Sequence, residues 1–281
     1  MSDETDKKIM SEAHNTFHAK KRRARRGDGN PQKRFAKRRI EREENEKLYL
    51  YGLHTVRQAL RNPNRTNLGL YVTKNGFARL EEDTSFRIDI PVVEKLPLDL
   101  SKMVGSEAVH QGVVLHTTPL PRKPIGALKE CDLVLLLDQV TDPHNVGAIM
   151  RSAVALNAGA MLTTSRYSPV ESGVLAKSAS GALDLIDHIE VRNLSETLLE
   201  LENNGFTTVG LDSEESIPME ELIEQSKIAL VLGAEGKGLR QKTRQTCQHV
   251  VRLDMPGAIK SLNVSNAAVL ALYLSREKLS R

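Results

Sequence analysis

Short apolar runs that alternate with helical patterns in the second half of the chain limit the choice of fold more than any other feature. The run Val134-Leu135-Leu136-Leu137 contains no polar residue, which is typical of a strand covered on both faces. Alternation of such strands with helices predicts an α/β fold with a mainly parallel sheet. We expect strands at residues 133–137, 160–163, 186–191, 206–211, 228–232 and 250–253, and helices at 149–156, 174–180, 194–202 and 264–278.

A smaller α/β region precedes this pattern. Apolar residues with helical spacing lie between Gly52 and the helix-breaking Asn62-Pro63-Asn64. The Pro-rich stretch at 119–127 is typical of a linker, because prolines stiffen the chain and remove backbone donors. Further expected elements are strands at 68–73, 90–93 and 113–118 and a helix at 98–103. The predicted organisation is a basic arm (1–47), a small domain (48–118), the linker (119–127) and a large domain (128–281).

The first 47 residues carry most of the positive charge. They contain 15 Lys and Arg against 9 Asp and Glu, whereas the remaining residues contain 25 against 27. Like charges at this density repel one another and leave little apolar surface to bury, so we predict a disordered arm. Basic side chains that neutralise phosphates release counterions, which makes RNA a suitable partner. The alternative is a solubilising tail without a partner.

Composition excludes several classes of protein. Apolar residues make up 40% of the chain, but no apolar run approaches the roughly 20 residues of a membrane-spanning helix. The N-terminal region lacks a secretion signal, and its acidic residues count against a transit peptide. We therefore expect a cytoplasmic protein with no membrane partner. Cys131 and Cys247 are too few and too far apart for a disulfide framework or a metal cluster, so we expect buried cysteines and no metal.

The first of three polar segments, Asp142-Pro143-His144-Asn145-Val146-Gly147, follows the strand expected at 133–137. Its Asp-Pro pair suits the N-cap and first residue of a helix. Ligands of open α/β sheets bind at the carboxyl ends of strands, and helical spacing puts His144, Gly147 and Arg151 on one face. Arg151 is therefore a candidate ligand-binding residue; the alternative is a solvated surface arginine.

The second segment, Gly233-Ala234-Glu235-Gly236-Lys237-Gly238, follows the strand expected at 228–232. Its three glycines permit close approach of the backbone to a ligand. The segment has neither the spacing of a phosphate-binding loop nor that of a dinucleotide fingerprint, which disfavours ATP and NAD. Glu235 is a candidate to accept hydrogen bonds from a ligand, with a solvated turn as the alternative.

The third segment runs from Met255-Pro256-Gly257 to Ser261-Leu262-Asn263-Val264-Ser265, at the entry to the last helix. One Ser or Asn is enough to cap a helix, yet three such residues lie here. A helix N-terminus also offers unpaired N–H groups to an electron-rich ligand. Capping and ligand binding are compatible roles for this segment.

In their order and spacing, the three segments resemble the motifs of the SpoU (TrmH-type) RNA 2'-O-ribose methyltransferases. This resemblance covers the chain from Asp132 to the C-terminus. Two further stretches, Tyr51-Gly52-Leu53-His54-Thr55-Val56 and His110-Gln111-Gly112-Val113, are similar to the ribosomal-protein-like RNA-binding domain of family members that act on a guanosine of large-subunit ribosomal RNA.

The resemblance implies that S-adenosylmethionine is the cofactor, that the substrate is a ribose 2'-hydroxyl in RNA, with a guanosine of 23S ribosomal RNA favoured, and that the chain forms a C-terminal trefoil knot and a homodimer. By motif position, it implies catalytic roles for Asn145, Arg151, Glu235, Ser261 and Asn263. It implies cofactor contacts, largely through the backbone, for Gly210, Leu211, Gly233, Leu253 and Leu262.

Arginine stays protonated in proteins, so holding an RNA phosphate or a developing alkoxide suits Arg151 better than accepting a proton. We expect Asn145, Ser261 and Asn263 to orient the ribose and Arg151, and Glu235 to hold the edge of the substrate or cofactor. The alternatives are the same reaction on transfer RNA and a non-catalytic RNA-binding ribosome assembly factor. An aromatic content of 4% leaves few base-stacking platforms.

Overall fold

A computed structural model describes residues 48–121, 123–215, 217–222 and 224–279 of the chain. The basic arm at residues 1–47 lies outside the described residues, and its predicted disorder and RNA binding stay predictions. Residues from Leu48 onward form one compact unit. No helix in the described ranges combines the length and apolarity that crossing a membrane requires.

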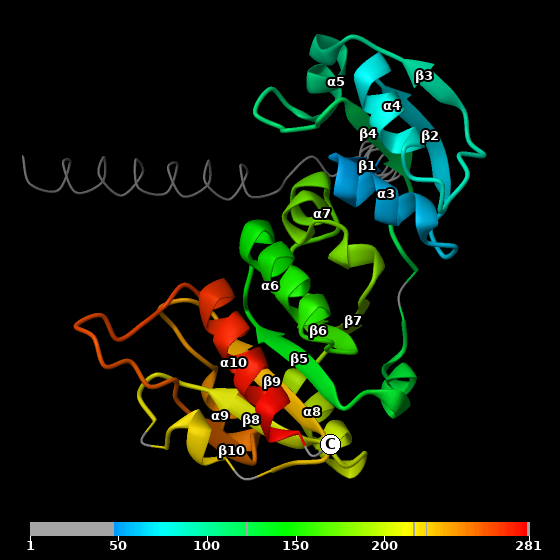
Figure 1. Cartoon of the computed structure of the whole chain (residues 1–281). Helices are drawn as coiled ribbons and strands as arrows, with labels where there is room; N and C mark the ends of the chain where they lie inside the picture. The colour runs from blue at the N-terminus through cyan, green and yellow to red at the C-terminus, as the bar shows by residue number, and fades with distance from the viewer. Residues whose placement is uncertain (1–47, 122, 216, 223, 280–281) are drawn as a thin grey trace, which may run out of the picture. The chain divides into compact units, whose positions relative to one another are not determined.

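The larger of two sheets has six strands in the order β10-β8-β9-β5-β6-β7, and every neighbouring pair is parallel (Figure 1). This arrangement confirms the predicted α/β fold with a mainly parallel sheet. The strands are β5 (Leu133–Asp138), β6 (Ala160–Thr164), β7 (Asp187–Val191), β8 (Thr207–Leu211), β9 (Ile228–Gly233) and β10 (His249–Val251).

Side chains of the central strand β5 alternate between two apolar cores. Leu133, Leu135 and Leu137 belong to one core and Val134 and Leu136 to the other. Burial on both faces explains why this strand reads as a continuous apolar run.

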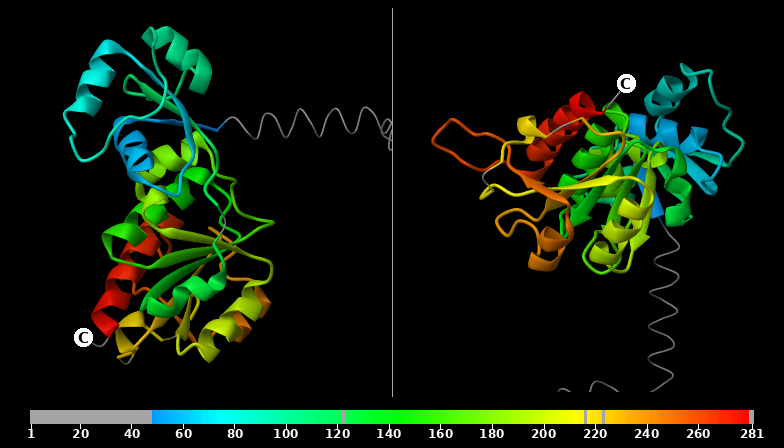
Figure 2. Two further views of the ribbon diagram at one scale, coloured as in Figure 1. Left: turned by 90° about the vertical axis from the view of Figure 1, so that its right-hand side faces the viewer. Right: turned by 90° about the horizontal axis from the view of Figure 1, so that it is seen from below.

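Helices cover both faces of this sheet. The core that contains Leu135 also receives α6 (Pro143–Ala155), α7 (Gly173–Ala179) and α10 (Val264–Lys278), whereas α8 (Leu194–Asn203) packs into the opposite core. Figure 2 shows α10 lying beside α6, with the segment between β10 and α10 extending away from the sheet. A short helix, α9 (Gln241–Thr246), was not predicted from the sequence.

The smaller sheet has the strand order β1-β4-β2-β3, with the β2–β3 pair parallel and the other pairs antiparallel. Most of its elements agree with the sequence prediction. Two elements were missed: β1, whose four residues give little periodicity, and α4, whose sequence is polar and contains a glycine. The elements are β1 (Leu48–Tyr51), α3 (Leu53–Arg61), β2 (Asn67–Val72), α4 (Lys74–Glu81), β3 (Val92–Glu94), α5 (Pro97–Val104) and β4 (Val113–Thr117).

The predicted linker is partly ordered. The 3₁₀ helix η1 (Ile125–Glu130) crosses the expected boundary between residues 127 and 128. The Leu120 N–H donates to Glu171 Oε2 at 2.9 Å. The start of the predicted linker is therefore attached to the segment before α7 rather than free.

Helix α6 begins earlier than its apolar pattern alone predicts, at Pro143 instead of residue 149. The predicted N-cap is confirmed, since Asp142 Oδ1 accepts a hydrogen bond from the His144 N–H at 3.0 Å. Gly147 packs closely on α7: a Cβ there would lie 2.6 Å from the Leu175 carbonyl oxygen. The expectation that His144, Gly147 and Arg151 form one ligand-facing surface is wrong for Gly147, because α7 covers it.

We predict that Gly147→Ala destabilises the protein by about 2 kcal/mol, because overpacking at a backbone contact outweighs the better helix propensity of alanine. Urea denaturation measures this loss. Gly126→Ala is the matched control, since a Cβ at Gly126 meets no atom within 4 Å. Equal denaturation midpoints for the two variants would contradict close α6–α7 packing.

Candidate functional site

The first two polar segments meet because their parent strands are parallel neighbours. Strands β5 and β9 pair in a register that places Asp138 opposite Gly233. Both strands therefore end at the same level of the sheet. The chain leaves β5 through Gln139, whose φ of 63° is left-handed, and enters α6. It leaves β9 directly into the glycine-rich loop.

Both ends of the glycine-rich loop are attached to Asp138. The loop starts at Gly233, opposite Asp138, and ends at Arg240, whose backbone N–H and Nε donate to the two Asp138 carboxylate oxygens at 3.1 and 2.6 Å. Asp138 is fully buried. A side chain at Gly233 would collide with the Gly238 carbonyl group. The loop is thus held against β5, and its close backbone approach requires glycine at position 233.

Asn263 joins the three segments. Its Nδ2 donates to Asn145 Oδ1 at 3.2 Å and to Glu235 Oε2 at 3.4 Å. Its Oδ1 caps α10, accepting from the Ser265 N–H at 2.9 Å and the Ser265 hydroxyl at 2.6 Å. An amide side chain offers two donors and two acceptor sites, and all four are in use. Asn263 therefore positions its neighbours and has no spare hydrogen bond for a ligand.

Two hollows adjoin the cluster of Asn145, Glu235 and Asn263. The larger, of about 660 Å³, includes Glu235 and Asn263 in its wall. The smaller, of about 470 Å³, is lined by Asn145, Glu235, Tyr167 and Lys237. Glu235 and Lys237 face both hollows. Both volumes lie in the range of about 300–1,000 Å³ that small-molecule sites occupy.

Most of the residues that were expected to bind the cofactor surround the larger hollow. The lining includes four of those five positions and Ser261, which was expected to be catalytic. Gly210 is not among the lining residues; a Cβ there would lie 2.8 Å from Leu239 Cδ1 and 3.1 Å from Cys247 Sγ. Core packing thus explains that glycine. The four lining positions are Leu211, Gly233, Leu253 and Leu262.

Arg151 lies apart from these hollows. It is exposed on α6, two turns along the helix from Asn145, and lines neither of the two. Among the described residues it has no ion pair. Its predicted catalytic role stays a prediction.

Sequence reasoning missed four residues at the site. Asp138, directly after the strand expected at 133–137, and its partner Arg240 were given no role, because their pairing spans a separation of 102 residues and leaves no local signal. Tyr167 follows β6 and is 41% exposed at the wall of the smaller hollow. Lys237 was considered only in excluding a phosphate loop. A search for side chains just after each parallel strand would have found Tyr167.

Neither Cys131 nor Cys247 lines the two hollows. Both are half-buried rather than fully buried, which corrects the expectation from sequence. Burial raises the pKa of the Cys247 thiol to about 12, so this thiol stays protonated at neutral pH. In the parts of the chain that the structure describes, no three His, Cys, Asp or Glu side chains are grouped to hold a metal ion.

Two family models match the chain. Residues 132–273 match the SpoU rRNA methylase family, and residues 49–122 match the RNA 2'-O ribose methyltransferase substrate-binding model. Among curated relatives, the 23S rRNA (guanosine-2'-O-)-methyltransferase RlmB of Ralstonia nicotianae is 35% identical over 231 residues, covering 80% of this chain and 93% of the relative. RlmB of Pseudomonas aeruginosa is 34% identical, covering 80% and 94%.

Solved structures share the fold. The SpoU methyltransferase AviRb from Streptomyces viridochromogenes in complex with AdoMet superposes with a TM-score of 0.72 at 23% identity, covering 85% of this chain and 92% of that one. An rRNA methyltransferase from Sinorhizobium meliloti gives a TM-score of 0.68 at 20% identity, covering 85% and 90%. With three motif segments converging on Asn263 and both models matched, this chain belongs to the SpoU family of RNA methylases.

Proposed function

We propose that this protein transfers a methyl group from S-adenosylmethionine to the ribose 2'-hydroxyl of a guanosine in 23S ribosomal RNA. The observation that carries this proposal is the convergence of Asn145, Glu235 and Asn263 between two hollows. Family membership and similarity to RlmB enzymes support the reaction and the substrate. A substrate of this kind assigns the protein to the cytoplasm.

The larger hollow suits the cofactor. Leu211, Leu253 and Leu262 offer apolar surface for the adenosine, and the glycine-rich loop offers backbone groups at close range. Asp212 and Glu214 bring carboxylates to the same lining, where they complement hydroxyl donors and positive charge. When bound, S-adenosylmethionine supplies a methyl group on a sulfonium that a nucleophile can attack.

The smaller hollow suits the target nucleoside. Tyr167 offers an aromatic face on which a base can stack, and Lys237 offers a cation to a phosphate. Asn145 and Glu235 have hydrogen-bonding capacity beyond their contacts with Asn263, and we assign them to the ribose. Since Glu235 lines both hollows, it lies where the 2'-hydroxyl and the methyl donor must meet. Holding both reactants in line supplies much of the rate enhancement.

Arg151 completes the proposed chemistry. As a permanent cation it is suited to hold an RNA phosphate or to stabilise the developing alkoxide. It lines neither hollow of its own chain. It therefore acts on reactants that meet at Glu235 by holding a phosphate of RNA that extends beyond the smaller hollow, or by reaching the site of a second copy of the chain. Accepting the proton of the 2'-hydroxyl is a less favourable role for Arg151, because arginine stays protonated in proteins.

A homodimer is part of this proposal, and α10 supports it. Val269, Leu270 and Tyr273 lie 41%, 45% and 55% exposed on this helix. Large apolar side chains gathered on one face commonly mark a protein interface. The trefoil knot also remains part of the proposal, on the grounds of family membership. The domain at 48–118 is assigned to RNA binding, as its family model suggests.

Mass spectrometry of nuclease-digested RNA, from cells with and without this protein, tests the function. We expect loss of one 2'-O-methylguanosine from the large-subunit RNA, restored by the wild-type protein but not by Asn263→Asp. Aspartate still caps α10 but replaces the amide donor beside Glu235 with a like charge. Loss of a 2'-O-methylated nucleoside from transfer RNA instead would show that transfer RNA is the substrate. No change in any ribose methylation would favour the assembly-factor alternative.

We predict that Arg151→Ala lowers methyl transfer by at least about 100-fold, as removal of a group that stabilises transition-state charge does, while cofactor affinity changes little. Radiolabelled methyl transfer and calorimetric titration with S-adenosylmethionine measure the two effects. Arg151→Lys, which keeps the charge, is expected to retain part of the activity. Parallel loss of activity and cofactor binding in Arg151→Ala would assign a structural role to this residue.

We predict that Leu270→Glu converts the dimer into a monomer, because it places a charge on the exposed apolar face of α10. Analytical ultracentrifugation measures the mass of each form. Leu199→Glu is the control, since Leu199 is a similarly exposed leucine (52%) on α8. A wild-type protein that sediments as a monomer, or dissociation by both variants, would refute this interface.

A further inference from the structure

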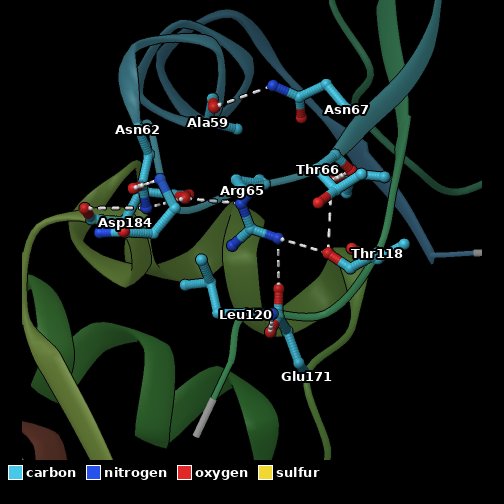
Figure 3. Close-up of polar contacts among 11 residues, drawn as sticks. Ala59, Asn62, Arg65, Thr66, Asn67, Thr118, Leu120, Glu171 and Asp184 are labelled. Carbon is cyan, nitrogen blue, oxygen red and sulfur yellow. Dashed lines mark hydrogen bonds and ion pairs between the residues drawn. The ribbon is translucent and has the colours of Figure 1, made fainter. Parts of the chain in front are cut away.

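Arg65 links the small domain to the large domain through buried ion pairs. It lies just after α3, and its side chain has no exposed surface. The Nε donates to Asp184 Oδ1 at 2.6 Å, and Nη1 donates to Glu171 Oε1 at 2.7 Å (Figure 3). Nη1 also donates to the Thr118 carbonyl oxygen at 3.2 Å. A single cation thus joins two carboxylates of the large domain to the end of the small one.

The two carboxylates flank helix α7. Glu171 precedes the helix, and Asp184 ends the 3₁₀ helix η2 (Ala182–Asp184) that follows it. Each has a second partner near Arg65. The Leu120 N–H donates to Glu171 Oε2 at 2.9 Å, and Asn62 Nδ2 donates to Asp184 Oδ1 at 2.9 Å. The small domain and the start of the linker therefore hold the chain on both sides of α7.

The body of α7 also contacts the small domain. The buried Thr55 hydroxyl donates to the Ala176 carbonyl oxygen at 3.2 Å. Lys177 Nζ donates to Gln111 Oε1 at 3.0 Å, and the same oxygen accepts from the Leu53 N–H at 3.1 Å. These contacts come from α3 and from the turn before β4. They give α7 a second row of attachments between the two carboxylates.

The other side of α7 packs on the helix that carries Asn145. Gly147 of α6 approaches the α7 backbone so closely that a Cβ would lie 2.9 Å from the Ala179 nitrogen. Asn145 lies two residues earlier on α6. A continuous path of contacts therefore runs from Arg65 through the two carboxylates and α7 to the cluster of Asn145, Glu235 and Asn263.

Ion pairs of this kind specify geometry more than they add stability. Removing two opposite charges from water is costly, and apolar side chains of similar volume often stabilise a contact as well. A guanidinium, however, presents donors in a fixed planar fork that a carboxylate meets in only a few orientations. Arg65 is engaged on two edges of that fork by carboxylates from two separate segments. Sliding of the small domain along α7 would break both ion pairs.

We propose that Arg65 is a positioning residue for methyl transfer: through Glu171 and Asp184 it fixes the orientation of the RNA-binding domain on α7, so that a long RNA held by that domain is presented to the catalytic cluster. This inference rests on the proposed function. It predicts that Arg65 matters for RNA long enough to contact both domains and is dispensable for RNA that reaches only the cluster.

The test compares Arg65→Lys with the wild-type full chain on two RNAs. One is a long fragment of the large-subunit RNA, and the other contains only the methylated nucleotide and its nearest neighbours. Lysine keeps the charge but cannot span both carboxylates. We expect the ratio of kcat/KM on long RNA to kcat/KM on short RNA to fall at least about ten-fold. A loss of this size is reasonable when an RNA bound by one domain is no longer held in a fixed position at the second site. The affinity for S-adenosylmethionine should stay within about two-fold.

Arg61→Lys is the matched control, because Arg61 forms its ion pair with Asp83, within the small domain. It should leave the ratio unchanged, whereas Asp184→Asn should lower it as Arg65→Lys does. Equal losses on both RNAs would show that Arg65 acts only through general stability and would overturn the proposal. An unchanged ratio of the two kcat/KM values in Arg65→Lys would overturn the proposal as well.

Hydrogen exchange gives a readout that does not depend on catalysis. In Arg65→Lys, amides of α3 and α7 should exchange faster, while those of β4 and β5 keep their protection because each domain stays folded. Unchanged exchange in α7 would refute the docking role. If the wild-type protein methylates neither RNA, the proposed function fails, and the exchange experiment alone decides whether Arg65 fixes the domain.

Discussion

The parallel pairing of β5 with β9 is the constraint on which the site depends. Because Asp138 lies opposite Gly233, the two loops that follow these strands begin side by side although 95 positions separate them in the numbering. The buried Asp138 carboxylate then holds the far end of the glycine-rich loop through Arg240. A buried carboxylate must be hydrogen-bonded or paired, so the strand end and the loop end stabilise each other. Glu235 is carried on a loop attached at both ends.

The third segment reaches this point through helix packing rather than strand pairing. Helix α10 packs beside α6 and over β9, which brings its N-cap, Asn263, to the ends of both loops. Since the cap already occupies both acceptor sites of the Asn263 side chain, its two N–H donors serve Asn145 and Glu235. One side chain thus caps the start of a helix and aligns two others. In the proposed function, ligand contacts therefore fall to Asn145, Glu235 and the backbone of the glycine-rich loop.

Helix α6 connects the site to the rest of the molecule. Its first turn carries Asn145, and its second turn carries Gly147 against α7. On the far side of α7, Arg65 engages Glu171 and Asp184. The small domain, which the linker composition alone would leave free, is therefore docked through polar contacts. The two sheets share one apolar core as well, which contains Leu50 of β1, Leu115 of β4 and Leu175 of α7.

Local features of the sequence predicted many of the secondary-structure elements and part of the candidate site. Continuous apolar runs identified the buried strands, Asp142 was recognisable as a helix cap, and glycine at 233 indicated close backbone approach. The structure selected Asn263 as the cap of α10 from three candidates at its entry. The motif order placed Asn145, Glu235 and Asn263 in one predicted site, and the structure brings these three together. Only the tertiary structure decided which distant segments meet: Asp138 with Arg240, Tyr167 and Asn145 in the wall of one hollow, Gly210 against Cys247, and Arg65 between two carboxylates. The physical reason is the sequence separation over which each interaction acts. Caps, turns and burial periodicity depend on a few neighbouring residues, whereas an ion pair depends on which distant segments the packing of the whole fold brings together.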